Sequence, residues 1–412
     1  MMEEGVKNKY ERKPVIIVSI VTALCLLGDS MLYIVLPIYY KEAGLTSLWE
    51  VGVLLSVNRF VRLPLNPLIG WLYKTITLRA GLIAAVVLGA LTTIGYGVWH
   101  GFWAWLLLRC MWGLAWSLLR MGGFFTVINY SGSSNRGHLM GIYNGLYRLG
   151  SLFGMLLGGF LAPLIGLPYV ALLFGIASLI GLPFITAYIS REKAIETASQ
   201  SPHKKIQVRH LSKPVIKVVV SGLCISMLFQ GLLTSTLSFV IDSHYSQTIF
   251  LWGLAIGATT LSGSLLAARW TWEPFLASRF GRWSDGPRGR VPLLIISLFC
   301  AAIGFTLIPL QLPLFLWIFV ILLVLVSATS LTTLIDALAS DVAKHSSAVT
   351  VMTTHSVALD LGAALGPTIG YWFIELKHGV LITYLGGALL FLLISGWWYP
   401  KQKTQIGLPL SK

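Results

Sequence analysis

The sequence predicts an all-α membrane protein with twelve transmembrane helices in two pseudo-symmetric six-helix bundles. Of its 412 residues, 56% are hydrophobic and only 11% are charged, whereas soluble domains carry about 25% charged residues. Long apolar runs recur along the whole chain, and a transmembrane helix needs about 20 such residues. A glycine-rich segment also occurs twice, 212 positions apart. A repeat of this kind indicates two halves related by pseudo-symmetry.

The expected spans follow from the apolar runs, which are separated by charged residues or by Gly and Pro breaks. Each run has enough apolar residues to cross a bilayer as a helix. In chain order the runs lie at 14–40, 48–73, 79–99, 102–129, 138–165, 168–190, 214–242, 248–275, 291–310, 313–338, 348–374 and 379–399.

The distribution of Lys and Arg predicts the orientation. If the N-terminus is cytoplasmic, the cytoplasmic segments carry 21 Lys and Arg residues, and the outer loops carry only Lys41 and Lys377. Cytoplasmic loops of membrane proteins are enriched in positive charge. We therefore expect an integral protein of a bacterial inner or plasma membrane with both termini in the cytoplasm. This enrichment of Lys and Arg on the cytoplasmic side also accounts for most of the net charge of +15. The expected partner is therefore the lipid bilayer and not a nucleic acid.

The domain organisation follows from the long polar break at 191–213, which separates spans six and seven. We expect an N-terminal six-helix bundle at 1–190, a cytoplasmic linker at 191–213 and a C-terminal six-helix bundle at 214–412. The sequence Lys-Pro-Val-Ile at 13–16 recurs at 213–216, so the seventh span begins like the first. This second match supports a duplication.

The glycine repeat has three glycines at spacing four in each copy. They are Gly150, Gly154 and Gly158 in the first copy, and Gly362, Gly366 and Gly370 in the second. Small residues at this spacing permit close helix packing, so we expect a mainly structural role. The charged residue two places before the first glycine is inverted, however, being Arg148 in one copy and Asp360 in the other.

Several motifs along the chain resemble the major facilitator superfamily of secondary transporters. Span four contains Arg109 and Gly113 in an Arg-x-x-x-Gly pattern, and Arg136-Gly137 with Gly141 is similar to the family's entry to helix five. Residues 150–159 resemble the motif Gly-x-x-x-Gly-Pro-x-x-Gly-Gly of the drug–proton antiporter branch, with Met155 in place of proline. Residues 33–37 also resemble that branch. The resemblance covers the whole chain.

A set of residues in the second half resembles the cytoplasmic charge relay of the family, and the first half has no complete equivalent. The set consists of Gly281, Asp285, Arg288, Arg290 and Asp341. In the first half, Lys74 and Asn129 stand where the acidic members are expected. The resemblance therefore implies a relay that is kept in the C-terminal half and lost in the N-terminal half.

Two buried charges are expected in the N-terminal half. Asp29 and Arg109 lie inside spans one and four, and an ionisable side chain in hydrocarbon needs a partner, water or a function. The resemblance implies that these helices line a central cavity, so Asp29 is a candidate proton-titrating carboxylate with Arg109 beside it. The alternative is a permanent structural pair. Gln230, assigned to the position that matches Asp29 at an offset of 200, and His355 are further cavity candidates; a structural histidine is the alternative for His355.

Four charges are predicted to form a gate between the bundles, as two ion pairs that form when the cytoplasmic side closes and part when it opens. Arg62 and Glu273 occupy equivalent positions at an offset of 211 with inverted charge, as Arg148 and Asp360 do. The resemblance implies that helix two packs against eleven and helix five against eight, which pairs Arg62 with Asp360 and Arg148 with Glu273. The alternative for Glu273 is a local pair with Arg269. Asp336, near the end of span ten, is expected to meet the Arg288–Arg290 loop.

The function expected from these observations is proton-coupled secondary transport by alternating access, exporting a small organic solute such as a drug-like compound or a metal chelator. An alternative is uptake or exchange of an organic anion, because intramembrane arginines outnumber carboxylates. A third is a non-transporting sensor. We expect a monomer that is not an enzyme, since no nucleophile motif, metal-ligand cluster or phosphate loop is present. No metal and no cofactor are expected.

Overall fold

The computed structural model describes residues 2–131, 135–191, 212–245, 248–251, 254–286, 289–344 and 348–399. Most of the predicted linker, 192–211, lies outside the described residues, as does Arg288 of the predicted charge relay. Nearly all of the described chain is helical, so the predicted fold class is confirmed.

The N-terminal half contains seven helical segments. They are α1 (Met2–Tyr39), α2 (Leu48–Leu72), α3 (Leu78–Val98), α4 (Phe102–Tyr130), α5 (Arg136–Ile165), α6 (Leu167–Leu179) and α7 (Gly181–Tyr188). The sixth predicted span is therefore two helices that meet at Ile180. The remaining spans of this half match single helices to within a few residues, except that α1 begins well before position 14.

The C-terminal half begins with a span built from three segments. The α-helix α8 (Lys213–Ser226) passes into a π-helix, η1 (Met227–Leu233), and then into α9 (Thr234–Tyr245). The helices that follow are α10 (Ala258–Ser284), α11 (Arg290–Leu307), α12 (Leu314–Lys344), α13 (Ala348–Ile374) and α14 (Gly379–Trp398).

The eighth predicted span, 248–275, is wrong at both ends. Its first part forms an antiparallel hairpin of β1 (Thr248–Leu251) and β2 (Leu254–Gly257), in which Thr248 pairs with Gly257. Apolar content does not distinguish a short strand from a helix, and aromatic and β-branched residues favour a strand. The helix α10 starts at Ala258 and continues to Ser284, through charged residues that the hydropathy pattern had assigned to a loop.

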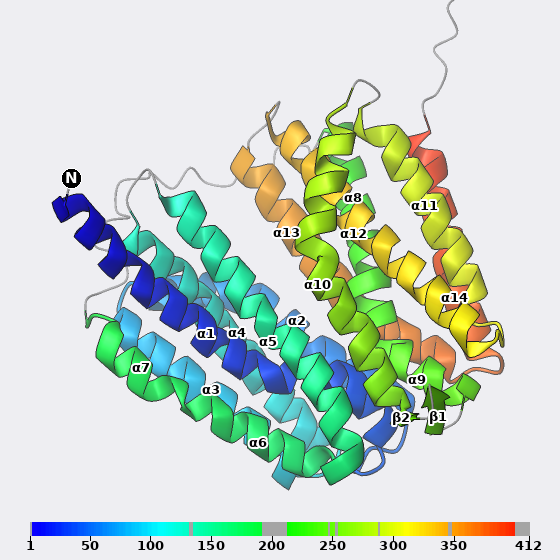
Figure 1. Ribbon diagram of the computed structural model, residues 1–412, viewed down its shortest axis with the longest axis horizontal. Helices are drawn as coiled ribbons and strands as arrows, with labels where there is room; N and C mark the ends of the chain where they lie inside the picture. Colours follow the sequence, from blue (N-terminus) through cyan, green and yellow to red (C-terminus); the bar gives the residue numbers. More distant parts are fainter. Residues whose placement is uncertain are drawn as a thin grey trace, which may run out of the picture.

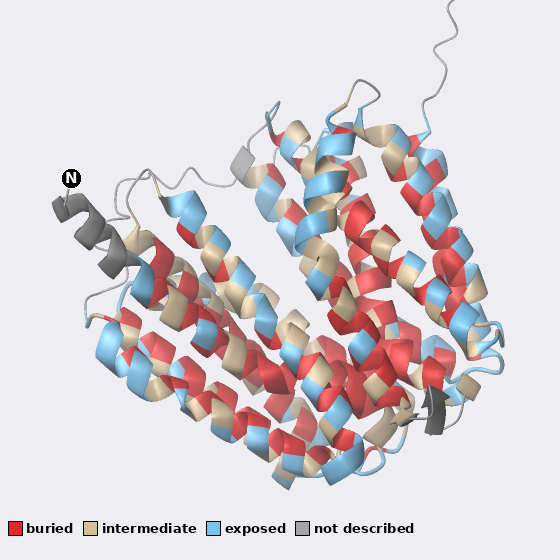
Figure 2. Ribbon diagram, viewed as in Figure 1, coloured by how far each residue is buried: buried red, intermediate tan, exposed pale blue. Residues whose placement is uncertain are grey.

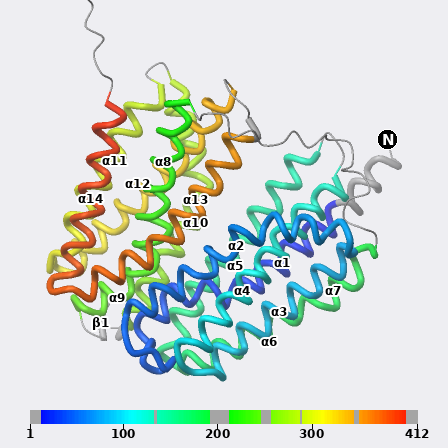
Figure 3. Tube along the Cα trace, turned by 180° about the vertical axis from the view of Figure 1, so that it is seen from behind, coloured from blue at the N-terminus to red at the C-terminus, as the bar shows by residue number. Residues whose placement is uncertain are grey.

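The two halves form two bundles that meet at one end and diverge at the other. Figures 1 and 3 show them converging near the β1–β2 hairpin and separating toward the side that holds the start of α1 and the end of α14, which we call the terminal side. Buried residues are concentrated inside each bundle in Figure 2. At the converging end the cores merge, because Tyr371 and Ile374 of α13 pack in a cluster formed mainly by the N-terminal half.

Polar contacts close the converging end. The Thr368 hydroxyl of α13 lies 2.8 Å from the Ser56 hydroxyl of α2, and the backbone N–H of Trp49 donates to Glu375 at 3.0 Å. The bundles also meet between α5 and α10, where the hydroxyl of Thr259 donates to the Gly159 carbonyl at 3.0 Å. The structure is thus closed on the side opposite the terminal side.

Ten spans in the described part of the chain are long and apolar enough to cross a membrane. The two remaining helices of the predicted twelve are α2 and α10. Both carry several charged residues, including Arg59 and Arg62 on α2 and Arg269 and Glu273 on α10. These helices depart from the membrane-spanning composition because they carry the charges that face the other bundle.

The glycine repeat packs each copy against the first helix of its own half. An added side chain at Gly154 of α5 would meet the Leu27 carbonyl of α1 at 2.6 Å, and one at Gly231 of η1 would meet Gly366 of α13 at 2.6 Å. The backbones approach so closely that only glycine fits. The partners correspond at an offset of 200: Ala23 and Leu27 for the first copy, and Leu223 and Met227 for the second. This is the offset of the repeated Lys-Pro-Val-Ile sequence.

Replacing Gly366 with alanine is expected to lower the free energy of unfolding by about 1–3 kcal/mol, because the new methyl group overlaps the η1 backbone. Gly386 of α14 is the matched control, since nothing lies within 4 Å of a side chain added there. Its alanine variant should be unchanged or slightly more stable, because alanine favours a helix. Thermal unfolding in detergent measures both. If the Gly366 variant were as stable as the control, close packing at this glycine would be disproved.

Candidate functional site

The candidate site lies where the bundles begin to diverge and is lined by charges from both. Arg62 of α2, Arg148 of α5, Glu273 of α10 and Asp360 of α13 each lie 10 to 12 residues from the terminal-side end of their helix. At 1.5 Å per residue this is a depth of about 15–18 Å. The four predicted gate residues therefore share one level, about half-way across a bilayer.

Glu273 contacts one arginine from each bundle. Its Oε1 lies 3.6 Å from Nη1 of Arg148, on α5 of the other bundle, and its Oε2 lies 3.5 Å from Nε of Arg269, four residues earlier on α10. The predicted inter-bundle contact and its local alternative are therefore both present. The Arg148 side chain is 51% exposed and that of Glu273 only 19%, so Arg148 reaches from the open side toward a mostly enclosed carboxylate.

Arg62 and Asp360 are not joined by a direct ion pair within the described part of the chain, so the second predicted gate pair stays a prediction for the state closed on the terminal side. Asp360 acts electrostatically on both Arg62 and Arg59. The Arg62 guanidinium instead lies 5.9 Å from the Trp116 ring, and its buried Nε has no hydrogen-bond partner. Arg62 therefore packs against a ring of its own bundle and makes no direct contact with Asp360.

Asp336 contacts His355; of the loop that it was predicted to meet, Arg288 lies outside the described residues and Arg290 is not in contact with it. Its Oδ1 lies 2.9 Å from Nε2 of His355, which joins α12 to α13 within the C-terminal bundle. The imidazole is almost fully buried, whereas the Asp336 side chain is 60% exposed. Asp336 also acts electrostatically on Arg148 of the other bundle. The pair therefore connects a buried titratable ring to the charged surface between the bundles.

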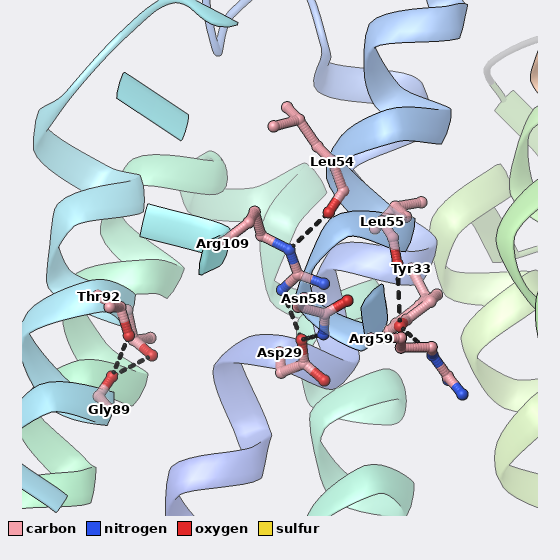
Figure 4. A network of polar contacts seen from close by, with 10 residues as sticks. Asp29, Tyr33, Leu54, Leu55, Asn58, Arg59, Gly89, Thr92 and Arg109 are labelled. Carbon is pink, nitrogen blue, oxygen red and sulfur yellow. Dashed lines mark hydrogen bonds and ion pairs between the residues drawn. The ribbon is translucent and has the colours of Figure 1, made fainter. Parts of the chain in front are cut away.

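Asp29 and Arg109 form a buried pair inside the N-terminal bundle (Figure 4). Arg109 Nη1 lies 2.5 Å from Oδ1 of Asp29, and Arg109 Nε donates to the Leu54 carbonyl at 2.8 Å. The same Asp29 oxygen accepts from the Asn58 amide at 3.3 Å. These contacts tie α1, α2 and α4 together away from the other bundle. The contact agrees with a permanent structural pair and with a titrating Asp29 beside Arg109, so a proton-titrating role for Asp29 stays a prediction.

A second polar group on α2 extends this network toward the other bundle. Arg59 Nε donates to the Tyr33 hydroxyl at 3.1 Å, and that hydroxyl donates to the Leu55 carbonyl at 3.3 Å. The Arg59 guanidinium also lies 5.6 Å from the centre of the Tyr33 ring. In Figure 4 Arg59 and the Asp29–Arg109 pair lie on either side of α2. This helix therefore separates the internal pair from the arginines that face Asp360.

Gln230 lies in the π-helix η1 and is partly buried. The offset of 200 that relates the helix partners places Phe229, not Gln230, at the position of Asp29. Phe229 is fully buried against Phe305 and Phe391, so an aromatic cluster replaces the buried ion pair in the second half. The π-helix itself was not predicted, because no local pattern signals it; such turns occur frequently at functional sites.

The predicted charge relay is present as contacts in the C-terminal half. Arg290 Nε lies 2.7 Å from Asp341, and its Nη2 lies 3.0 Å from Asp285. Asp341 also contacts Lys344 at 3.2 Å. These contacts join the ends of α10, α11 and α12 on the terminal side, close to Gly281. Their role in transport stays a prediction.

Sequence reasoning underestimated two groups at this site. Arg59 is one of the intramembrane arginines and is not predicted to belong to the gate. Its position three residues before Arg62, however, places both side chains on one face of α2. The Asp336–His355 pair joins residues 19 positions apart on different helices. No spacing rule pairs such residues. Among the residues that the structure describes, no three His, Cys, Asp or Glu side chains are grouped so as to hold a metal ion.

Comparisons with known proteins identify relatives of this chain. The model of the Major Facilitator Superfamily matches residues 18–284. The uncharacterised MFS-type transporter YcaD of Salmonella newport (strain SL254) is 25% identical over 274 residues, or 66% of this chain and 68% of the relative. YcaD of Salmonella typhi matches equally.

Two solved structures share the architecture. A bacterial homologue of the human lysosomal transporter Spinster, in an inward-facing and unoccupied conformation, has a TM-score of 0.74 at 13% identity, covering 95% of this chain and 96% of that one. A POT family transporter in complex with a thioalcohol-conjugated peptide has a TM-score of 0.73 at 11% identity, covering 94% of each chain. At these identities the likeness shows the fold alone.

Two helical bundles that meet around a charged interface define a secondary transporter, an integral membrane protein with its binding region between pseudo-symmetric repeats. The chain belongs to the major facilitator superfamily.

Proposed function

We propose that this transporter is proton-coupled and exports a small organic solute by alternating access. The observation that carries the proposal is the position of Glu273 between Arg148 of the other bundle and Arg269 of its own. A carboxylate between two arginines attracts both, and protonation removes its charge and weakens both contacts. Proton binding would therefore change the contact between the bundles at the level where they diverge, as a bistable interface requires.

The Asp336–His355 pair, in the same bundle as Glu273, also supports proton coupling. The pair offers an imidazole and a carboxylate as proton acceptors, and Asp336 is exposed and acts electrostatically on Arg148 of the other bundle. Export is supported only by the resemblance of residues 150–159 to the antiporter motif. In the structure these residues pack α5 against α1, so they provide a frame and do not identify the solute.

A second candidate function is uptake or exchange of an organic anion. Arg59, Arg62 and Arg148 all lie at the interface, and the buried Nε of Arg62 has no hydrogen-bond partner. A carboxylate or phosphate group on the solute would supply one, and guanidinium recognises such groups in a bidentate geometry. Asp360 opposes this function because it already acts on Arg59 and Arg62.

Proteoliposomes with an imposed pH gradient test the proposal. A library of cationic, neutral and anionic solutes is first screened for thermal stabilisation of the purified chain. For a stabilising solute, we expect proton movement in the direction opposite to that of the solute. In the Glu273→Gln variant, gradient-driven transport should be lost while solute exchange at equal pH continues, because the variant keeps the shape of the side chain but cannot ionise.

Different results separate the alternatives. Exchange of an anion that does not depend on the pH gradient, at the same rate in the wild type and in Glu273→Gln, would overturn the proton-coupled proposal and favour the second function. Stabilisation by a solute without any transport would favour a sensor. Glu42→Gln is the matched control, because Glu42 is an exposed carboxylate in the turn after α1, outside the set of charges between the bundles.

A further inference from the structure

A groove on the terminal side of the C-terminal bundle is separate from the site between the bundles. It has a volume of about 560 Å³ and lies between the beginning of α8 and the ends of α12 and α14. Its walls are almost wholly apolar and include Ile216, Leu338, Val342 and Trp397. Since Ile216 and Trp397 are more than two-fifths exposed, the groove opens outward, toward lipid.

Among the described residues that line the groove, the only charged side chains are two lysines. Lys213 and Lys217 are separated by four positions on α8, so they lie on the same face of the helix, one turn apart. Lys217 Nζ lies 4.1 Å from the centre of the Trp398 ring, and the Trp398 indole N–H donates to the Ser221 hydroxyl at 2.9 Å. The second lysine is thus held at the edge of the groove by a ring that is itself fixed.

Within the described part of the chain, no carboxylate lines the groove beside these lysines. The nearest acidic residue in sequence to the groove wall, Asp341, already contacts Arg290 and Lys344. The lysines also lie on the side that the Lys and Arg distribution predicts to be cytoplasmic, where anionic lipids give the membrane surface a negative potential. Tryptophan and lysine at this level are typical of the interface between headgroups and acyl chains.

We propose that this groove binds an anionic glycerophospholipid, with the phosphate of its headgroup between Lys213 and Lys217 and an acyl chain along the apolar wall. The occupant follows from charge complementarity: two cationic groups stand at the mouth of an apolar groove that opens to the bilayer. A zwitterionic lipid would leave the positive charge only partly compensated. The site does not depend on the proposed transport function, because it lies outside the region between the bundles.

The test is a lipid titration of the full chain in detergent, with the number of bound lipids read by native mass spectrometry. Phosphatidylglycerol should bind more tightly than phosphatidylcholine with the same acyl chains. In the Lys213→Gln/Lys217→Gln variant this preference should fall roughly 30-fold, from about 1 kcal/mol for each lysine near a membrane surface. Lys74→Gln, which removes an exposed lysine of the other bundle on the same side, should leave it unchanged.

A second variant tests the acyl-chain wall without altering the charges. Val342→Trp fills the groove and should reduce phosphatidylglycerol binding even though both lysines remain. Binding equal to the wild type in this variant would overturn the groove as the chain site. An undiminished preference in the double lysine variant would overturn the headgroup site. Competition by glycerol phosphate as effective as by the intact lipid would also contradict the proposal, since the site would then recognise a free phosphate.

Discussion

Replacing Arg109 with methionine is expected to lower the free energy of unfolding by about 3–5 kcal/mol, which makes it the most damaging single change that we foresee. The Arg109 side chain is fully buried, and its loss leaves Asp29 without its strongest partner. Removing one member of a buried ion pair is strongly destabilising because the remaining charge is uncompensated. Only the Asn58 amide would still donate to Asp29. Thermal unfolding in detergent provides the measurement.

The double variant Asp29→Leu/Arg109→Met decides whether the pair acts as a unit. It should recover most of the lost stability, since no charge remains buried. Arg120→Met is the control on the same helix, because Arg120 is only partly buried and contacts the Phe124 ring at 5.5 Å. A double variant no more stable than Arg109→Met would show that the loss does not come from an uncompensated Asp29.

Exchange of the charges at Arg148 and Glu273 is expected to restore what each single reversal removes. Arg148→Glu alone places two carboxylates together, and Glu273→Arg alone places three arginines together. The double variant again opposes one carboxylate to two arginines. Coupling between contacting residues is typically 0.5–3 kcal/mol, so each single reversal should shift the equilibrium between bundle arrangements by about 10-fold.

Spin labels report this shift without a known solute. Cysteines at Gly141 of α5 and Ser278 of α10 suit the labels, because the first has open space around it and the second is exposed; the four native cysteines are replaced by alanine. Each single reversal should lengthen the distance between the labels, and the exchange should restore it. The variant Arg148→Gln/Glu273→Gln has neither repulsion nor attraction at these two positions, so it should bring the distance between the labels less close to the wild-type value than the exchange does. Equal distances in all variants would contradict an energetic link across this interface.

Much of the fold could be predicted from sequence because hydrophobic burial and charge placement are local properties. The bilayer excludes unpaired backbone groups, so a long apolar run is a helix. The errors lie where this rule weakens. The segment 248–257 is apolar yet forms a hairpin, and α10 is a helix despite its charges. Its position against the other bundle supplies partners that the sequence pattern does not show.

The candidate site was less predictable than the fold because it consists of contacts between distant segments. The Arg148–Glu273 pairing was inferred from inverted charges in a repeat together with the family's helix arrangement, and the two side chains are in contact. The equivalent argument for Arg62 and Asp360 gave the right helices but no direct pair. The difference lies in Arg62, whose guanidinium lies against the Trp116 ring of its own bundle, a partner that no sequence spacing predicts.

The sequence by itself determined that the chain crosses the membrane repeatedly and consists of two related halves. Composition, apolar run length and the glycine register are sufficient for this, since each reflects a constraint imposed by lipid or by close helix packing. Only the tertiary structure decided that Glu273 contacts arginines of both bundles, that Asp336 contacts His355 and that a π-helix opposes the second glycine copy. These features depend on contacts between side chains of different helices. The strength of such contacts depends on distances that no spacing in the sequence determines.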